Sequence, residues 1–396
     1  DLHSFPTRRS SDLHIGARQV GKSTLCREIA LERGLGYRTL DDRDVREQAL
    51  EDPEGLLESL AESGAVIDEV QRAPELFLAL KAVIDRQQRP GQYLLSGSNQ
   101  PRMSIAIGES LQGRAAYRTL RPLTLSEQRF DEFQRGWSFL LSGNDVRVLD
   151  ALAERAGTSG ELNWQQIVKA GGFPRALAAP PEARPRVLDD YAKTFANRDV
   201  RDVLGIESTQ RFEDFLRLCA IRTGQPLNAH GMSSELGIAA TTVRRWVDAL
   251  GRSYLIELIP AYSRNASQRV IKAPKVFMLD SALALAAARE NEPTGFHLET
   301  LVASDLCVWR DHAPGRQVYH WRAASGQEVD FVLEDGGHLL PVEIKASTSV
   351  GSNDARHLRK FCESHAEAQR GLLLSGDSEI RALSAGIVAA PWWAVL

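Results

Sequence analysis

The residues with the clearest chemical potential lie near the beginning of the chain, where residues 16–24 read GARQVGKST and match G-x-x-x-x-G-K-[ST] at every fixed position. Gly16 and Gly21 allow backbone angles that turn successive N–H groups inward around a phosphate. We expect Lys22 to reach the β- and γ-phosphates of a nucleotide and the Ser23 hydroxyl to bind Mg²⁺. Thr24 follows in a helix whose positive end would face the anion.

Two carboxylates follow a short apolar strand that is predicted for residues 64–69 (GAVIDE). At such a position Asp68 would hold the Mg²⁺, and Glu69 would polarise the water that attacks the γ-phosphate. Together with the phosphate loop, these acids predict a nucleotide hydrolase.

Three further candidates come later in the chain. The apolar run at residues 93–99 (YLLSGSN) ends in small polar residues, and we expect Ser98 and Asn99 to contact the γ-phosphate or the attacking water. Arg114 would neutralise charge in the transition state, in its own site or in that of a neighbouring subunit. The alternative is that Arg114 is an ordinary surface residue.

Several segments resemble a prokaryotic family of AAA-type ATPases whose C-terminal half is a domain of unknown function. In chain order they are GARQVGKSTL, YRTLDD, VIDEVQRAP, YLLSGSNQ, SLQGRA and RPLTLSEQ, followed by GGFPRAL and by the VDFVLE and LLPVEIKAS segments near the C-terminus. The similarity covers nearly the whole chain. It implies ATP as the nucleotide, with Mg²⁺, and it leaves a homo-oligomer open.

The composition is that of an ordinary soluble chain of 396 residues, with 43% hydrophobic and 25% charged residues. A chain of this length can form two to four domains. It has no run of eighteen apolar residues and no signal-peptide pattern, so we expect a cytoplasmic protein without a membrane partner. The net charge of −4 argues against indiscriminate binding of nucleic acid.

The pattern of apolar residues divides the first half of the chain. Residues 1–13 show no periodicity, and we interpret them as a non-native segment, which leaves residues 13–15 as the apolar part of the strand before the phosphate loop. Residues 14–123 alternate short apolar runs with helical segments, which predicts an α/β P-loop ATPase domain with a parallel sheet. Residues 124–220 have the three- and four-residue spacing of helices, which predicts a helical lid or connector.

A winged helix is predicted for residues 221–280. Residues 233–250 have a short helix, a glycine turn and a second helix, as in a helix-turn-helix, and residues 254–262 and 275–279 suit the two strands of a wing. The basic residues outnumber the acidic ones, which favours contact with DNA phosphates, although winged helices also serve as protein-docking modules. These residues are Arg222, Arg244, Arg245, Arg252, Arg264, Arg269, Lys272 and Lys275, against Glu235, Asp248 and Glu257.

The last segment, residues 281–396, mixes helices and strands around two apolar runs. Asp330 lies in the first run, and the alternation of a strand places Glu343 and Lys345 on one face of the second. This arrangement resembles the PD-(D/E)XK nuclease fold.

That resemblance implies that Asp330 and Glu343 hold Mg²⁺, that Lys345 assists the attacking water and that Glu299, on a preceding helix, helps. The alternative is a degenerate copy of the fold, in which Glu343 and Lys345 form an ordinary cross-strand pair.

Two functions follow from these observations. In the first, ATP binding and hydrolysis are coupled to a C-terminal region that acts on nucleic acid, as a nuclease if its metal site is active. In the second, ATP drives a switch or a protein-binding module whose nuclease-like fold has lost its chemistry. A nuclease assay with Mg²⁺ and Mn²⁺ separates the two.

Overall fold

The structure is a computed structural model that describes residues 11–87, 89, 91–98, 111, 115–130, 136–142, 145–160, 162–196, 209–323 and 325–396. It divides into two compact units, residues 1–121 with 248–255 and residues 122–247 with 256–396. The three segments that we distinguished beyond residue 123 therefore lie largely within one compact unit. Of the helices in these ranges, none is long and apolar enough to cross a membrane.

Five parallel strands form the sheet of the first unit, in the order β2-β3-β4-β1-β5. They are β1 (Ser11–Gly16), β2 (Gly36–Thr39), β3 (Ala65–Asp68), β4 (Tyr93–Ser96) and β5 (Ala115–Leu120). Because all five strands run in the same direction, their carboxyl ends meet at one edge of the sheet. Strand β4 lies between β1 and β3, so its tip separates the phosphate loop from the two acids.

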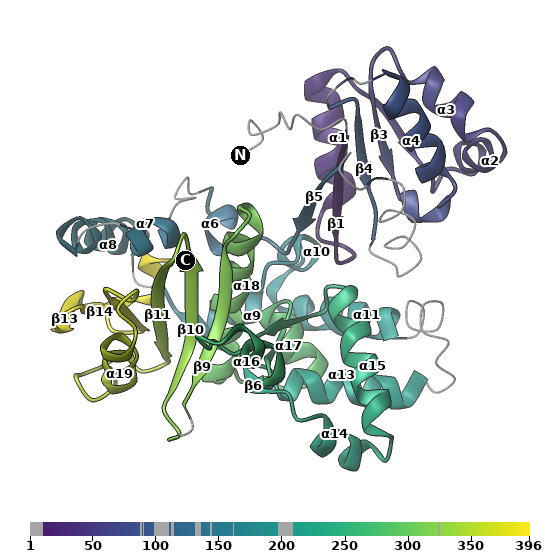
Figure 1. Cartoon of the computed structure of the whole chain (residues 1–396). Helices are drawn as coiled ribbons and strands as arrows, with labels where there is room; N and C mark the ends of the chain where they lie inside the picture. The colour runs from purple at the N-terminus through teal and green to yellow at the C-terminus, as the bar shows by residue number, and fades with distance from the viewer. Residues whose placement is uncertain are drawn as a thin grey trace. The chain divides into compact units, whose positions relative to one another are not determined.

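Helices cover both faces of this sheet (Figure 1). They are α1 (Lys22–Arg33) on one face, and α2 (Arg43–Glu51), α3 (Pro53–Ser59) and α4 (Leu76–Gln87) on the other. The period of two in a strand explains the division, since Val66 and Leu94 pack with α1 whereas Ile67 and Leu95 pack with the opposite helices.

Strand β1 is longer than the sequence predicts. We expected residues 13–15 alone to remain as a strand, but β1 begins at Ser11, within the segment that we had set aside. Its whole length is paired with β5, and its first four residues also pair with β4. Pairing on both sides supplies backbone hydrogen bonds that the polar sequence Ser11-Asp12 does not reveal, because strand preference depends strongly on neighbours.

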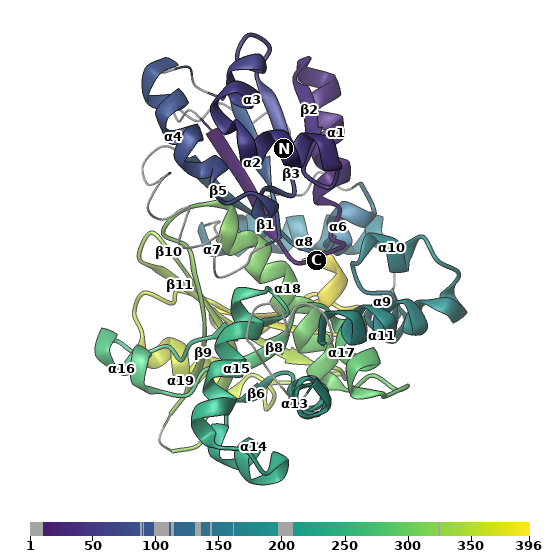
Figure 2. The same ribbon diagram turned by 90° about the vertical axis from the view of Figure 1, so that its right-hand side faces the viewer.

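The second unit contains a six-stranded mixed sheet in the order β13-β14-β12-β11-β10-β9. Its strands are β9 (Gln317–Arg322), β10 (Glu328–Asp335), β11 (His338–Lys345), β12 (Gly371–Ser375), β13 (Arg381–Ser384) and β14 (Ile387–Pro391). Helix α18 (Gly295–His312) packs on one face and α19 (Arg356–Ser364) on the other, which buries two apolar clusters. Figures 1 and 2 both place α18 beside β10 and β11.

A smaller three-stranded sheet, in the order β6-β8-β7, belongs to the region where we predicted a winged helix. Its strands are β6 (Gln225–Pro226), β7 (Ile256–Ile259) and β8 (Lys275–Met278), and all neighbours are antiparallel. Around it lie α13 (Thr209–Ile221), α14 (Ala229–Leu236) and α15 (Ala240–Arg252), which are close together in both views (Figures 1 and 2). The predicted helix, glycine turn and second helix are present, with Gly237 in the left-handed conformation at φ 61° after α14.

The remaining elements are helical. They are η1 (Val70–Arg72), α6 (Leu125–Gln128), α7 (Gly136–Ser142), α8 (Asp145–Ser159), α9 (Trp164–Ala170), α10 (Pro174–Leu177), η2 (Pro181–Ala183), α11 (Arg184–Thr194), α16 (Ala266–Ile271), α17 (Ser281–Ala288) and η4 (Trp392–Ala394). Most of them lie between residues 124 and 220, where we predicted helices.

Candidate functional site

The phosphate loop joins the end of β1 to the start of α1. Gly21 precedes the helix with φ 95° and ψ 10°, and Gly16 ends the strand with φ 151°. Both backbone conformations favour glycine. At Gly16 a Cβ atom would lie 2.1 Å from the carbonyl oxygen of Leu120, so the close approach of β5 excludes any side chain there. The local geometry thus accounts for both glycines of the motif.

Lys22 points back into this loop. Its side chain is 7% exposed, and its Nζ donates hydrogen bonds to the carbonyl oxygens of Gly16 (3.2 Å) and Ala17 (2.5 Å). Burial lowers the pKa of Lys22 to about 8, and the nearby charges of Glu69 and Asp68 oppose that shift. The structure therefore brings the lysine of one motif into electrostatic reach of the two acids of the other.

Asp68 and Glu69 stand at the end of β3. Asp68 is 2% exposed, and its Oδ1 accepts a hydrogen bond from the backbone N–H of Glu69 (3.0 Å). Glu69 has φ 59°, a left-handed conformation that is uncommon for a residue with a side chain. Its carboxylate accepts a hydrogen bond from the side-chain amide of Gln71. A turn of this kind redirects the chain directly after the strand, and such backbone strain is often found at functional sites.

Sequence reasoning missed Tyr37. This residue lies on β2, and its hydroxyl donates a hydrogen bond of 2.8 Å to Asp68 Oδ2. The guanidinium of Arg27 lies 5.3 Å from the centre of the tyrosine ring. Burial and the bond to Asp68 raise the pKa of Tyr37 to about 12, so the hydroxyl remains a donor at neutral pH. The only signal in the sequence is that a tyrosine begins the YRTLDD segment, which does not identify its partner.

The tip of β4 supplies Ser98. Its Oγ is buried and has no hydrogen-bond partner among the residues that the structure describes, so it has the capacity to bind a ligand or water. Ser23 is half-buried on the first turn of α1, and Thr24 beside it is exposed. Asn99 and Arg114 lie outside the described residues.

The residues at this edge fit a nucleotide with a divalent metal. The first turn of α1 offers backbone N–H groups to phosphate, with Lys22 as a cation. Asp68 and Ser23 are the oxygen ligands that Mg²⁺ prefers.

A second group of charged residues lies in the second unit, where we considered a nuclease-like site. The bulge in β10 between Val329 and Val332 sets the direction of Asp330, whose Oδ2 accepts a hydrogen bond from the backbone N–H of Ile344 (2.9 Å). Glu343 and Lys345 share a face of β11, as predicted, and form an ion pair of 2.6 Å.

The centre of this group is a lysine that we had assigned to the DNA-binding surface. Lys275 of β8 is 2% exposed, and its Nζ lies 3.5 Å from Glu299 Oε2 and 3.3 Å from Asp330 Oδ1. It also lies 2.9 Å from Glu328 Oε1. The expectation that Lys275 contacts phosphate is therefore wrong, because its ammonium is buried among carboxylates.

Burial and mutual repulsion act on the acids around this lysine. Burial raises the pKa values of Glu299 and Glu343, and the neighbouring carboxylate of Asp330 raises them further. The three carboxylates close to Lys275 raise the pKa of that lysine despite its burial. Within the described ranges, no group of three or more His, Cys, Asp or Glu side chains has the geometry of a metal site.

Other basic residues of the predicted winged helix also have internal partners. Arg222 pairs with Glu235, Arg252 pairs with Asp248 at 2.9 Å, and Arg269 lies against the rings of Tyr262 and Tyr319 and contacts Glu334 at 3.2 Å. Arg244 and Arg245 on α15 are exposed, and neither has an ion pair with a described residue. The excess of positive charge counted from the sequence is reduced at the surface, because Lys275 is buried and Arg269 pairs with an acid outside the predicted winged helix.

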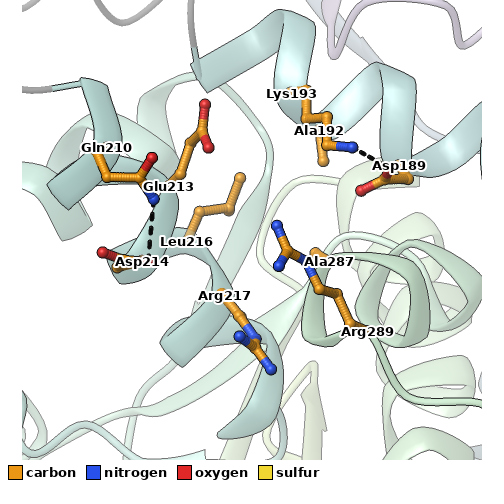
Figure 3. A pocket seen from close by; sticks show the side chains of 10 residues that line it. All are labelled: Asp189, Ala192, Lys193, Gln210, Glu213, Asp214, Leu216, Arg217, Ala287 and Arg289. Carbon is orange, nitrogen blue, oxygen red and sulfur yellow. Dashed lines mark hydrogen bonds and ion pairs between the residues drawn. The ribbon is translucent and has the colours of Figure 1, made fainter.

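A small pocket in the second unit contains none of the predicted site residues (Figure 3). It lies between α11, α13 and α17 and is lined by Asp189, Ala192, Lys193, Gln210, Glu213, Asp214, Leu216, Arg217, Ala287 and Arg289. Three of its charged residues are engaged locally, since Lys193 pairs with Asp189 at 2.5 Å and Arg217 donates to the carbonyl of Ala288 at 3.3 Å. The lining mixes acids and bases, so it indicates no ligand class.

Comparison with known protein families gives three matches along the chain. Residues 13–128 match a family described as an AAA domain, residues 161–294 match a domain of unknown function, and residues 294–395 match a second domain of unknown function. The first match, with the parallel sheet and the phosphate loop, supports a P-loop domain of the AAA type. The first and third matches support the resemblance to prokaryotic AAA-type ATPases.

Relatives and solved structures add little about activity. The chain is 26% identical over 387 residues to uncharacterized proteins of Mycobacterium tuberculosis and Mycobacterium bovis, which covers 95% of this chain and 78% of each relative. A variant of RuvB from Thermotoga maritima is 19% identical, with 64% of this chain and 82% of that chain covered and a TM-score of 0.28. A signal transduction ATPase with numerous domains and a tetratricopeptide repeat sensor, from Pyrococcus horikoshii, is 12% identical, with 76% and 46% covered and a TM-score of 0.24.

Proposed function

We propose that the first unit is a Mg²⁺-dependent ATP hydrolase. The observation that carries this proposal is the meeting of Lys22, Asp68 and Glu69 at one edge of a parallel sheet, where the charges of the two acids act on the lysine. These residues come from motifs more than forty positions apart in the chain. Their convergence supports one catalytic site and is difficult to explain as two unrelated structural features.

Each residue has a distinct part in this reaction. Lys22 and the backbone N–H groups of the loop bind the phosphates. Ser23 and Asp68 would hold the metal, which would supply positive charge for the β- and γ-phosphates. Glu69 orients the attacking water and accepts its proton. Ser98, from the strand between the two motifs, is placed to contact the γ-phosphate or the water.

The test compares Glu69→Gln with the parent protein. The amide keeps the size of the side chain but is a poor base, so ATP binding should persist while turnover falls by a factor of 100 or more, on the order of 3 kcal/mol. Binding is measured by titration with a fluorescent ATP analogue, and turnover by phosphate release. Glu75→Gln is the matched control, because Glu75 is an exposed acid a few residues further along. Equal turnover in Glu69→Gln and the parent would show that Glu69 is not the base.

For the second unit we propose a binding module rather than an active nuclease. The supporting observation is that the ammonium of Lys275 already pairs with Glu299 and Asp330, two of the acids that a nuclease would need for its metal. The helix-turn-helix, with Arg244 and Arg245 exposed on α15, is the proposed contact surface, and DNA is the partner that its remaining positive charge favours. ATP binding or hydrolysis in the first unit would then control this interaction.

A cleavage assay tests the module against the nuclease. The parent protein should leave single- and double-stranded DNA and RNA intact in Mg²⁺ and in Mn²⁺, with and without ATP. Cleavage that Asp330→Ala abolishes would contradict the module and restore the nuclease hypothesis.

A further inference from the structure

We propose that Glu299, Asp330 and Glu343 form a site for a divalent cation such as Mn²⁺ or Mg²⁺, and that the ammonium of Lys275 occupies this site and excludes the metal. The proposal is independent of ATP hydrolysis, since it concerns the second unit alone.

The first argument is the origin and burial of the lysine. Lys275 comes from the small sheet, whereas its acidic partners come from α18 and β10 of the larger α/β region. A 2% exposed ammonium is costly to bury unless carboxylates compensate it, and here they do so from two elements at 3.3 and 3.5 Å. Two of the three acids of the site, Glu299 and Asp330, are therefore already in contact with a positive charge.

The second argument is the balance of charge. Glu299, Asp330, Glu343 and Glu328 supply four carboxylates, and Lys275 with Lys345 supplies two ammonium groups. Negative charge is in excess at a buried position, which favours a cation of higher charge than an ammonium.

The third argument is an unused ligand atom. Glu343 is 5% exposed and its Oε1 binds Lys345, but its Oε2 is buried and has no hydrogen-bond partner among the described residues. The Oδ1 atom of Asp330 and the Oε2 atom of Glu299 would lose a partner if Lys275 were removed. Three carboxylate oxygens would then be available, and such oxygens are the ligands that Mg²⁺ and Mn²⁺ prefer.

The experiment is a titration of the nucleotide-free full chain with MnCl₂, followed by the electron paramagnetic resonance signal of free Mn²⁺. Lys275→Met should bind one more Mn²⁺ per chain than the parent. The dissociation constant for this ion should be at least about tenfold lower than that of any Mn²⁺ binding at the same acids in the parent. Lys272→Met is the matched control, because this lysine is exposed three residues away. It should behave as the parent does. In Lys275→Met with Glu343→Gln, the added site should be lost or weakened to the level of the parent.

Thermal unfolding provides a second readout that does not require a stable metal-free variant. If Lys275→Met is unfolded without metal, MnCl₂ should restore its folding, since the ion replaces the missing ammonium. A variant that gains no Mn²⁺ site, or that remains unfolded with Mn²⁺, would overturn the proposal. Equal Mn²⁺ binding at these acids in the parent and in Lys275→Met would overturn it too, because Lys275 would then exclude nothing.

Discussion

Replacing Tyr37 with Phe removes the hydroxyl that holds Asp68 and leaves the ring in place beside Arg27. The lost bond joins the tyrosine hydroxyl to Asp68 Oδ2 at 2.8 Å. Hydrogen bonds to a charged group contribute about 1.5 to 3 kcal/mol, and the half-buried position of Tyr37 favours the lower value. A residue that orients a metal ligand typically changes metal affinity or activity by about 10- to 100-fold. We therefore expect the Mg²⁺ concentration for half-maximal ATP turnover to rise about tenfold, which corresponds to about 1.4 kcal/mol.

The assay separates this effect from general damage. ATP turnover is measured across a range of Mg²⁺ concentrations, and binding of a fluorescent nucleotide is measured in EDTA, where Tyr37→Phe should match the parent. Tyr117→Phe, at an exposed position on β5, is the control for loss of a phenolic hydroxyl in the same sheet. If Tyr37→Phe has the Mg²⁺ requirement of the parent, the hydrogen bond does not position Asp68 for metal. If the parent itself does not hydrolyse ATP, that result contradicts the proposed ATPase function and not the role of the Tyr37 hydroxyl.

Three further outcomes are expected. Lys22→Ala should weaken ATP binding by about 100-fold, since this buried ammonium is the cation that the loop directs at the phosphates, and unchanged affinity in a nucleotide titration would contradict that role. Changing Arg244 and Arg245 together to Ala should weaken DNA binding across sequences and reduce the slope of log affinity against log salt by about two, whereas a protein-docking surface would have no such slope in either protein. Burial, followed by the charge of Arg118, lowers the pKa of His14 from 6.5 to about 4. Between these two pH values the unfolded chain binds more protons than the folded chain. The free energy of unfolding should therefore decrease as the pH drops from 6.5 to 4, by up to about 3 kcal/mol. Urea unfolding followed by circular dichroism should show a shallower fall for His14→Gln, and parallel pH profiles for the two proteins would rule out this contribution.

The positions of the residues at the candidate nucleotide site could be predicted because the information that fixes them is local. Gly16, Gly21 and Lys22 lie within one loop, and Asp68 and Glu69 directly follow an apolar run, so spacing alone places each group at the end of a strand. Parallel strands then bring these ends together. The same reasoning places Glu343 and Lys345 on one face of β11, which their ion pair confirms.

The missed residues depend on pairings between distant segments. Tyr37 meets Asp68 because β2 lies beside β3, and Lys275 meets Asp330 across 55 positions of sequence. Neither neighbour has a signature in a local pattern. A count of charges also treats a buried lysine and an exposed one alike, which is why Lys275 was assigned to a surface that it does not reach.

The contacts of Lys275 constrain how the two matched segments of the second unit can evolve. One family match ends at residue 294 and the next begins there, yet Lys275 lies in the first segment and Glu299, Glu328 and Asp330 lie in the second. A gene fusion or recombination event at that boundary would join a lysine to acids with which it had not evolved, or leave buried acids without their counterion. We therefore expect homologous sequences to exchange the two segments together, and to replace Lys275 only where the acids around it have changed as well.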